Sequence, residues 1–199
     1  YLGYSLDLKG SEYYSIYLRD INTNKILTEI IKDTSGSITF SLDDKFIFYS
    51  KLDKLHRPRQ IFRHKIGTPL KNDELIFEEK SEAFTVGIAL SSDKKYFFIK
   101  TSDHNTSEEY FFGAEEENPK PRLIKKRKKG VIYSVNSWNG YFYNHTNEDA
   151  EDFKIDICKD LINQDWKSYI PAKNEVLIGG LTFLKNWILR SEVSNALAK

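Results

Sequence analysis

The sequence predicts an all-β fold, a partial β-propeller built of four-stranded antiparallel blades, on three observations. Residues 35–79 contain four short strand-like runs within about 45 residues, the length and strand content of one propeller blade. An aromatic or apolar run recurs along the chain at steps of about 45 to 50 residues. Each later copy of this run comes directly after a turn signal. Before that turn lies a segment in which apolar and polar residues alternate. Such regular spacing indicates a repeat architecture.

The unit Ser35–Glu79 is the most complete copy of the repeat. Its first run alternates Ile38, Phe40 and Leu42 with polar residues, which is the period of a half-buried strand. Asp43-Asp44-Lys45 then forms a turn signal, and a continuously apolar run, Phe46–Tyr49, predicts a strand covered on both faces. The third and fourth runs cover residues 60–66 and 74–79. The unit is therefore expected to be one whole blade.

The apolar second strand marks the same place in every repeat. Its copies are Tyr1–Tyr4, Phe46–Tyr49, Tyr96–Ile99, Tyr141–Tyr143 and Trp187–Leu189. The third strand is expected at the same steps, at Tyr17, Phe62, Phe112 and Ile157. The blade boundaries follow from this register: a partial blade over residues 1–34, whole blades over 35–79, 84–128 and 130–170, and the start of another over 175–199. The chain is thus predicted to be a single propeller segment.

Two places admit a second interpretation. Leu189, Val193 and Leu197 are four residues apart, which would suit a helix, but Trp187–Leu189 matches the strand that recurs in each repeat and favours a strand. Gly179-Gly180 lies inside a strand-like run. We expect a β-bulge there rather than a phosphate-binding loop, because no other part of a glycine-rich phosphate motif accompanies it.

Composition excludes several classes of protein. The 199 residues are 40% hydrophobic and carry a net charge of +1, so a soluble globular chain without a global field for nucleic acid or anionic membranes is expected. No run approaches the length of a membrane span, and the first residues lack the basic and apolar regions expected of a signal peptide. The single Cys158 cannot form an internal disulfide, which favours the cytoplasm. The absence of Met and the start on Tyr1 suggest an internal piece of a longer protein.

The sequence offers no convincing catalytic residue. Ser102, Asp103 and His104 are the residue types of a nucleophilic triad, but triad members normally converge from separate loops, and these residues are also ordinary turn formers. The G-x-S-x-G turn that carries the nucleophile of an α/β-hydrolase is absent from these 199 residues. The four His residues show no metal-ligand spacing, and His64, which alternates with Phe62 and Ile66, is expected to be hydrogen-bonded within the sheet. We predict no catalytic residue, no metal and no cofactor.

Two basic segments are candidate contact surfaces. His56, Arg57, Arg59 and Arg63 could meet a carboxylate of another domain or of a peptide, since guanidinium groups bind carboxylates in a two-pronged way; the alternative is a solvated loop and strand face. Lys125–Lys129 resembles a nucleic-acid or nuclear-localisation patch. This run lies at the end of an outer strand, where charged residues discourage unwanted pairing with another strand. We therefore predict no nucleic acid and no membrane as partners.

Particular segments of the sequence resemble a known family. SLDLKGSEYYSIYLRDI from Ser5, TSGSITFSLDDKFIFYSKLD from Thr34, HRPRQIFRHKIGTP from His56, SDHNTSEE from Ser102 and SVNSWNGYFYNHTNEDAEDFKI from Ser134 are similar to the propeller of the oligopeptidase B (protease II) branch of the prolyl oligopeptidase family. The resemblance covers nearly the whole chain and is weakest after Pro171.

The resemblance implies part of a cytosolic serine peptidase that cuts short peptides after Lys or Arg. In this family a seven-bladed propeller covers an α/β-hydrolase domain and restricts substrate size. The family's catalytic Ser, Asp and His belong to that hydrolase domain, so none has a matching position here, and the segment is expected to be non-catalytic. The implied partners are the hydrolase domain and oligopeptides, and exposed blade faces suggest self-association as well. The alternative is a stand-alone propeller scaffold for protein–protein interaction.

Overall fold

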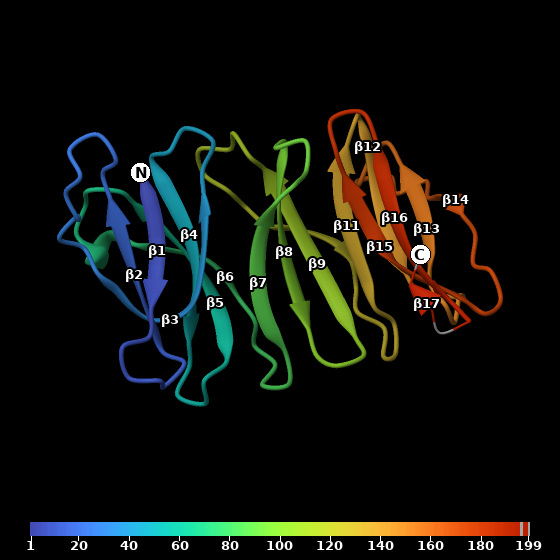
Figure 1. Cartoon of the computed structure of the whole chain (residues 1–199), viewed down its shortest axis with the longest axis horizontal. Coiled ribbons are helices and arrows are strands. Elements are labelled where there is room, and N and C mark those ends of the chain that lie inside the picture. Colours follow the sequence, from blue (N-terminus) through green and yellow to red (C-terminus); the bar gives the residue numbers. More distant parts are fainter. Residues whose placement is uncertain (196, 199) are drawn as a thin grey trace. The chain divides into compact units, whose positions relative to one another are not determined.

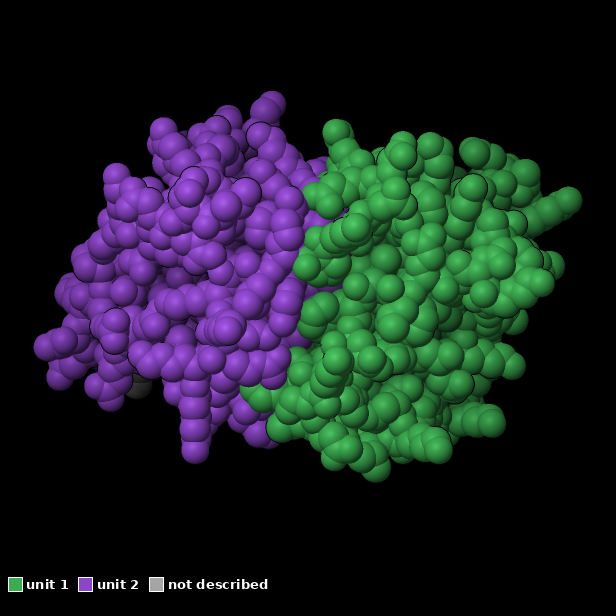
Figure 2. All heavy atoms as spheres, turned by 180° about the vertical axis from the view of Figure 1, so that it is seen from behind, with its two compact units in different colours: residues 1–89, 114–121 green, residues 90–113, 122–199 purple. Residues whose placement is uncertain are grey.

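The computed structural model describes residues 1–195, 197 and 198. It divides into two compact units, which are described separately: unit 1 contains residues 1–89 and 114–121, and unit 2 contains residues 90–113 and 122–199 (Figure 2). The described residues form antiparallel strands and one short 3₁₀ helix, η1 (Leu70–Asn72). No α-helix occurs among them. The prediction of an all-β fold is therefore confirmed.

Unit 1 contains a six-stranded antiparallel sheet in which the strands follow chain order (Figure 1). Its strands are β1 (Leu2–Leu6), β2 (Tyr14–Arg19), β3 (Ile31–Phe40), β4 (Phe46–Leu52), β5 (Pro58–Lys65) and β6 (Glu74–Glu78). A further strand, β7 (Thr85–Leu90), ends at the boundary of the unit. Consecutive antiparallel strands need only short connections, which is why the order along the chain and the order in the sheet agree.

The long strand β3 joins two parts of this sheet. Thr34 pairs with Tyr14 of β2 and with Lys51 of β4. At this residue β3 therefore changes from pairing with β2 to pairing with β4. The backbone there has positive φ at Asp33 (59°) and Gly36 (84°), which bends the strand. A core of buried Ile16, Leu18, Ile31, Ile47 and Tyr49 lies on one face of the sheet.

Unit 2 contains three groups of strands (Figure 1). The first is β8 (Tyr96–Ser102), β9 (Ser107–Gly113) and β10 (Arg122–Lys125). The second is a complete four-stranded sheet of β11 (Tyr133–Trp138), β12 (Tyr141–Thr146), β13 (Lys154–Cys158) and β14 (Lys167–Ile170). The third is β15 (Val176–Phe183), β16 (Ile188–Ser194) and β17 (Leu197–Ala198). Four-stranded antiparallel sheets that follow one another along the chain are the blades of a β-propeller.

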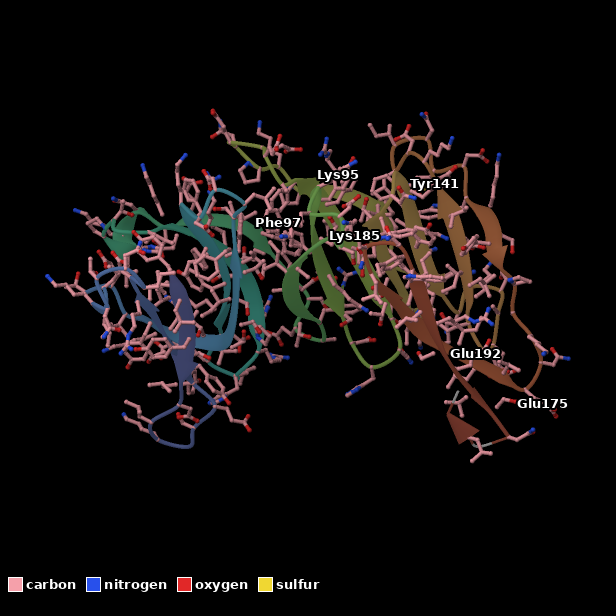
Figure 3. The ribbon with its side chains drawn as sticks, turned by 45° about the horizontal axis from the view of Figure 1, so that its top comes forward. Lys95, Phe97, Tyr141, Glu175, Lys185 and Glu192 are labelled. Atoms are coloured by element: carbon pink, nitrogen blue, oxygen red, sulfur yellow. The ribbon has the colours of Figure 1, made fainter. Side chains whose placement is uncertain are left out.

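The apolar second strand of the internal repeats is buried as its sequence predicts, whereas Leu2 in the first copy and Trp187 and Leu189 in the last copy are more than half exposed. Ile47 of β4 and Phe97 and Ile99 of β8 are at most 1% exposed (Phe97 is labelled in Figure 3). In unit 2 the side chains of Phe98, Phe111, Tyr133, Val135 and Phe142 form one core between the first two sheets, together with Ile124, Cys158 and Leu161. Burial on both faces explains why these strands are continuously apolar.

The turn before the second strand is built in the same way in both units. Ser41 Oγ donates to Asp43 Oδ1 (2.7 Å) and accepts from Phe46 N (2.9 Å). Ser91 Oγ makes the equivalent bonds to Asp93 Oδ1 (2.8 Å) and from Tyr96 N (3.0 Å). The turns predicted from Asp and Lys residues are thus confirmed, and a preceding Ser closes each of them.

The third strand lies where the repeat predicts it, because Tyr17, Phe62, Phe112 and Ile157 fall in β2, β5, β9 and β13, but its pairing with the second strand differs between repeats. Tyr17 and Phe62 face Tyr4 and Tyr49, as equal steps require. Ile99 instead faces Tyr110 and Asn144 faces Asp156, so Phe112 and Ile157 are out of phase with Phe62. The connections between second and third strands differ in length, and a hairpin loop sets the register of the strand that follows it. Equal spacing of residues along the chain therefore does not show which residues of the second and third strands pair with each other.

Two local predictions in the last sheet are confirmed. The pairing of β15 with β16 shifts register between Ile178 and Gly180, which is the bulge expected at the Gly pair. Residues 188–194 form strand β16 rather than a helix, and Leu197–Ala198 form β17. Residues 196 and 199 of the same segment lie outside the described residues.

Candidate functional site

The connection between β4 and β5 is organised by one carboxylate, Asp53. Its Oδ1 accepts hydrogen bonds from the backbone N–H groups of Leu55 (2.7 Å) and Arg57 (3.0 Å). Burial alone would raise the pKa of Asp53, but these bonds and the charges of Arg57 and Arg59 hold it below its usual value. The chain folds around this side chain in a turn that places His56 at a φ of 61°.

Arg57 and Arg59 bind the same carboxylate and the segment after β6. Their guanidinium nitrogens lie 3.7 and 3.9 Å from Asp53 Oδ2. Arg57 Nη1 also donates to the carbonyl of Glu82, and Arg59 donates through Nε (3.0 Å) and Nη2 (2.8 Å) to the carbonyl of Glu79. The two guanidinium groups therefore connect the β4–β5 loop to the segment that follows β6. The side chains of Arg57 and Arg59 remain partly exposed, at 28% and 21%.

His56 is the most open member of the basic group. It is exposed, and its ring lies edge-on to Tyr13 with 3.8 Å between ring centroids. The structure thus brings His56, Arg57 and Arg59 together at one end of the β4–β5 hairpin. Sequence analysis missed Asp53, although an acidic residue four positions before Arg57 was a visible signal.

Arg63 lies apart from the other three basic residues. Its side chain is only 7% exposed and donates to Glu74 Oε2 (2.6 Å) and to the carbonyl of Glu117 (2.7 Å). Its guanidinium also stacks over the ring of Phe46, 4.6 Å from the centroid. These contacts give Arg63 a structural role within unit 1.

His64 is hydrogen-bonded inside unit 1, as predicted. It is fully buried, and its Nδ1 lies 2.6 Å from Asp73 Oδ1. The other oxygen of Asp73 accepts from the hydroxyl of Tyr49 (2.8 Å). Burial first, and then the Asp73 carboxylate, raises the pKa of Tyr49. A pocket of about 430 Å³, lined by Tyr49, Asp73, Phe62 and the start of β3, opens beside this buried network.

Ser102 is the last residue of β8, and Asp103 and His104 lie in the connection from β8 to β9. Asp103 Oδ1 accepts from the backbone N–H groups of Asn105 (2.9 Å) and Thr106 (2.7 Å), which is how an Asp closes a hairpin connection. His104 is exposed. The turn-forming role expected for this segment is confirmed for Asp103.

The basic run Lys125–Lys129 is largely paired within unit 2. Lys125 and Lys128 both form ion pairs with Glu148, the second at 3.8 Å. Arg127 Nη2 lies 2.9 Å from Glu108 Oε1, and its backbone N–H donates to the other oxygen of the same carboxylate (2.8 Å). The charges of this run therefore stabilise the end of β10 and the crossover that follows it.

Three further properties bear on function. In the part of the chain that the structure describes, no group of three or more His, Cys, Asp or Glu side chains could hold a metal ion. No helix among the same residues is long and apolar enough to cross a membrane. Cys158 is buried, and burial raises the pKa of its thiol to about 11, so it is an unreactive thiol at neutral pH.

Comparison with known proteins assigns the chain to a family. A sequence model described as the prolyl oligopeptidase N-terminal β-propeller domain matches residues 1–199. The chain belongs to the prolyl oligopeptidase family. Protease 2 of Moraxella lacunata is 33% identical over 193 residues, which is 90% of this chain and 28% of that protein. The family assignment agrees with the resemblance found in the sequence.

Solved structures of the prolyl oligopeptidase family show the same fold. Oligopeptidase B from Leishmania major matches with a TM-score of 0.93 and 21% identity, over 98% of this chain and 28% of that one. Oligopeptidase B from Trypanosoma brucei, in a closed form with covalently bound antipain, matches with a TM-score of 0.89 and 25% identity over the same shares. The chain thus spans about 28% of the length of these relatives and corresponds to part of their N-terminal propeller.

Proposed function

We propose that this chain is the propeller segment of an oligopeptidase B-like serine endopeptidase that cleaves short peptides after Lys or Arg. The observation that carries the proposal is the 33% identity to Protease 2 along nearly the whole chain. The segment itself contributes no catalytic residue. Its partner in the same polypeptide is an α/β-hydrolase domain, which the propeller covers so that only oligopeptides enter, and the enzyme works in the cytoplasm.

The rigidity of the fold supports a covering role. Antiparallel sheets with cores of packed aromatic side chains change shape little, so a propeller can exclude folded proteins by geometry alone. The stand-alone scaffold remains the alternative. The coding sequence that follows Lys199 separates the two proposals: a G-x-S-x-G motif followed by Asp and His supports the peptidase, and its absence supports the scaffold.

The activity is tested on the polypeptide that carries this segment together with its downstream sequence. We expect it to hydrolyse short fluorogenic peptides with Arg or Lys before the cut and to leave the matched Pro peptide intact. The same Arg motif placed in a long unfolded protein should be cut poorly. Preference for Pro would overturn the proposed specificity, and equal cleavage of the long protein would overturn the covering role.

We further propose that His56, Arg57 and Arg59 contact a carboxylate of the catalytic domain or of a peptide. Their position on an exposed hairpin end supports this role, whereas Arg63 is too buried to reach another domain without rearrangement. His56→Asn keeps a residue that tolerates the left-handed backbone and removes the ring. We expect a raised KM for peptides with acidic residues and an unchanged KM for neutral ones. Unchanged values for both would exclude His56 from contact with a peptide carboxylate.

A further inference from the structure

Strand β11 of unit 2 is the end strand of its sheet, and no other strand of the described residues pairs with its second edge, which is buried. In its own sheet β11 pairs only with β12. On the other side, Tyr133 N donates to Ser107 Oγ (2.7 Å), and Val135 N donates to Glu109 Oε2 (2.9 Å). Buried backbone donors need partners, and here side chains of β9 supply them. The line where β9 side chains meet the β11 edge is called the β9–β11 seam.

Glu109 is the titratable partner in this seam. It is 2% exposed, and its backbone N–H donates to the hydroxyl of Tyr133 (2.8 Å), which in turn donates to the carbonyl of Lys125 (2.6 Å). By contrast, Ser107 binds both backbone groups of Tyr133 through a hydroxyl that does not titrate. Protonation of Glu109 can therefore change the seam at Val135 without any change at Ser107.

Charged residues on both neighbouring strands of the sheet face Glu109. Lys125 of β10 lies opposite it in the register, but its ammonium is paired with Glu148. Lys100 faces Glu109 directly across β8 and β9, and the hydroxyls of Ser134 and Tyr133 approach it from β11. His145 on β12 lies near the same Lys100, while its Nε2 binds the carbonyl of Ile178 (2.8 Å). The adjacent carboxylate, Glu108, is paired with Arg127. One half-buried ammonium is thus the main compensation for a charge on Glu109.

We propose that Glu109 is a proton-dependent latch: when it is protonated it holds the β11 edge against β9, and when it ionises the seam loosens. A neutral carboxyl still accepts the Val135 hydrogen bond but places no charge in the core. An ionised carboxylate at the same place keeps the bond and incurs the cost of burying a charge. Opening the seam relieves this cost because water then reaches the carboxylate.

The direction and size of the effect follow from proton linkage. Burial raises the pKa of Glu109 from its ordinary 4.5 to about 7, against the opposing effects of the Val135 N–H and Lys100. A group with a raised pKa stabilises the closed state fully below its ordinary pKa and loses this effect as pH rises to the raised value. The equilibrium constant for seam closure should fall about tenfold for each pH unit between 4.5 and 7 and level off above that.

Hydrogen exchange at the Val135 amide tests the latch, because this N–H donates to Glu109. The measurement is hydrogen–deuterium exchange with mass spectrometry on the purified protein, with fragmentation that resolves single amides. We expect the Val135 protection factor, which is corrected for base-catalysed chemical exchange, to fall about tenfold from pH 5.5 to 6.5. A flat or rising wild-type profile would overturn the proposal.

Two variants identify the titrating group. Glu109→Gln keeps an oxygen that accepts from the Val135 N–H and removes the charge, so the Val135 protection factor should no longer change with pH. The protection of amides of β4 in unit 1, which serve as the control, should be unchanged. Lys100→Met removes the compensating charge. The pH range over which the Val135 protection factor falls should therefore extend to higher pH. His145 cannot produce the expected slope, because its protonation loosens the structure as pH falls. Equal slopes in wild type and Glu109→Gln would assign the effect to another group and overturn the latch.

Discussion

His145 shows how one half-buried ring can make unit 2 sensitive to acid. Its Nε2 binds the carbonyl of Ile178, and its ring stacks on Phe153 with 4.6 Å between centroids. Burial, assisted by the charge of Lys100, lowers the pKa of His145 below its usual 6.5, although the bond to Ile178 opposes this shift. The neutral ring therefore fits the folded state better than the charged ring.

The first prediction is a loss of stability on acidification that depends on His145. A group with a lowered pKa contributes its full stability above the unfolded value of 6.5 and loses it as pH falls through the folded value. The urea midpoint of the wild type, relative to that of His145→Gln, should therefore fall from pH 7.5 to 5.5, because the opposing contribution of Glu109 is present in both proteins. His145→Gln retains an N–H donor for Ile178. Parallel profiles for the two proteins would show that another group titrates.

The second prediction concerns Arg63, whose buried guanidinium holds a carboxylate, a carbonyl and an aromatic face. Arg63→Met should destabilise unit 1 by about 2 kcal/mol, because the Glu117 carbonyl loses its donor and Glu74 loses its partner. Lys45→Met is the matched control, since Lys45 and Asp43 form a largely exposed pair at 3.0 Å and should matter little. Chemical denaturation of both variants measures the difference, and equal effects would contradict it.

At the scale of elements, β3 depends on a glycine at the point where it changes neighbours. Gly36 has a φ of +84°, and a Cβ there would lie 2.9 Å from Cγ of Tyr14. The left-handed backbone and the close ring both disfavour any other residue. The strand can therefore pair with β2 and β4 in succession only because this position lacks a side chain.

The third prediction compares two glycines. Gly36→Ala should destabilise the fold by about 1–3 kcal/mol. Gly87→Ala is the control, because Gly87 lies in β7 without a positive φ and a Cβ there would meet nothing within 4 Å. It should be neutral or slightly stabilising. Thermal unfolding of both variants checks this, and a neutral Gly36→Ala would show that β3 relaxes easily.

At the scale of the whole molecule, several apolar side chains are exposed on the strands nearest the two ends of the described chain. Trp187, directly before β16, is 72% exposed; in the last sheet Leu189 is 55% exposed and Leu197 66%, and on β1 Leu2 is 51% exposed. Side chains of these types at the corresponding places of internal strands, such as Phe97, are buried. Apolar faces of this kind tend to bind a partner surface.

The fourth prediction is that the 199-residue chain self-associates when produced alone. Light scattering after size-exclusion chromatography should give a mass above 23.3 kDa that increases with concentration. Trp187→Glu combined with Leu189→Glu should reduce the association. Leu55→Glu, at a 64% exposed loop position, should not. A monodisperse monomer at high concentration would refute the prediction.

The fifth prediction is that the same chain has no peptidase activity of its own. It should not hydrolyse a dibasic fluorogenic peptide, because Ser102 ends β8 and the Asp103 carboxylate binds backbone N–H groups of the connection to β9. Ser102→Ala should leave any background unchanged. Inhibitor-sensitive turnover that disappears in Ser102→Ala would show that the turn is catalytic.

The sequence by itself determined the strands, the turns and the family of this protein. Apolar alternation and the recurring run Phe46–Tyr49 report which residues are buried, and burial in a sheet depends mainly on local pattern. The bulge at Gly179-Gly180 and the strand at Ile188–Ser194 could be predicted for the same reason. The blade boundaries stay predictions, because the two compact units do not test them.

Only the tertiary structure decided which side chains meet across the fold. The register of Tyr110 and Asp156 depends on hairpin length, the roles of Asp53 and Asp73 depend on loops folding back on strands, and Glu109 reaches Val135 from another sheet. Such contacts join residues far apart in the chain or shifted by a single position. Hydrophobic periodicity reports burial and not the identity of the neighbour, so the partners of buried charges emerged only when the sheets were packed together.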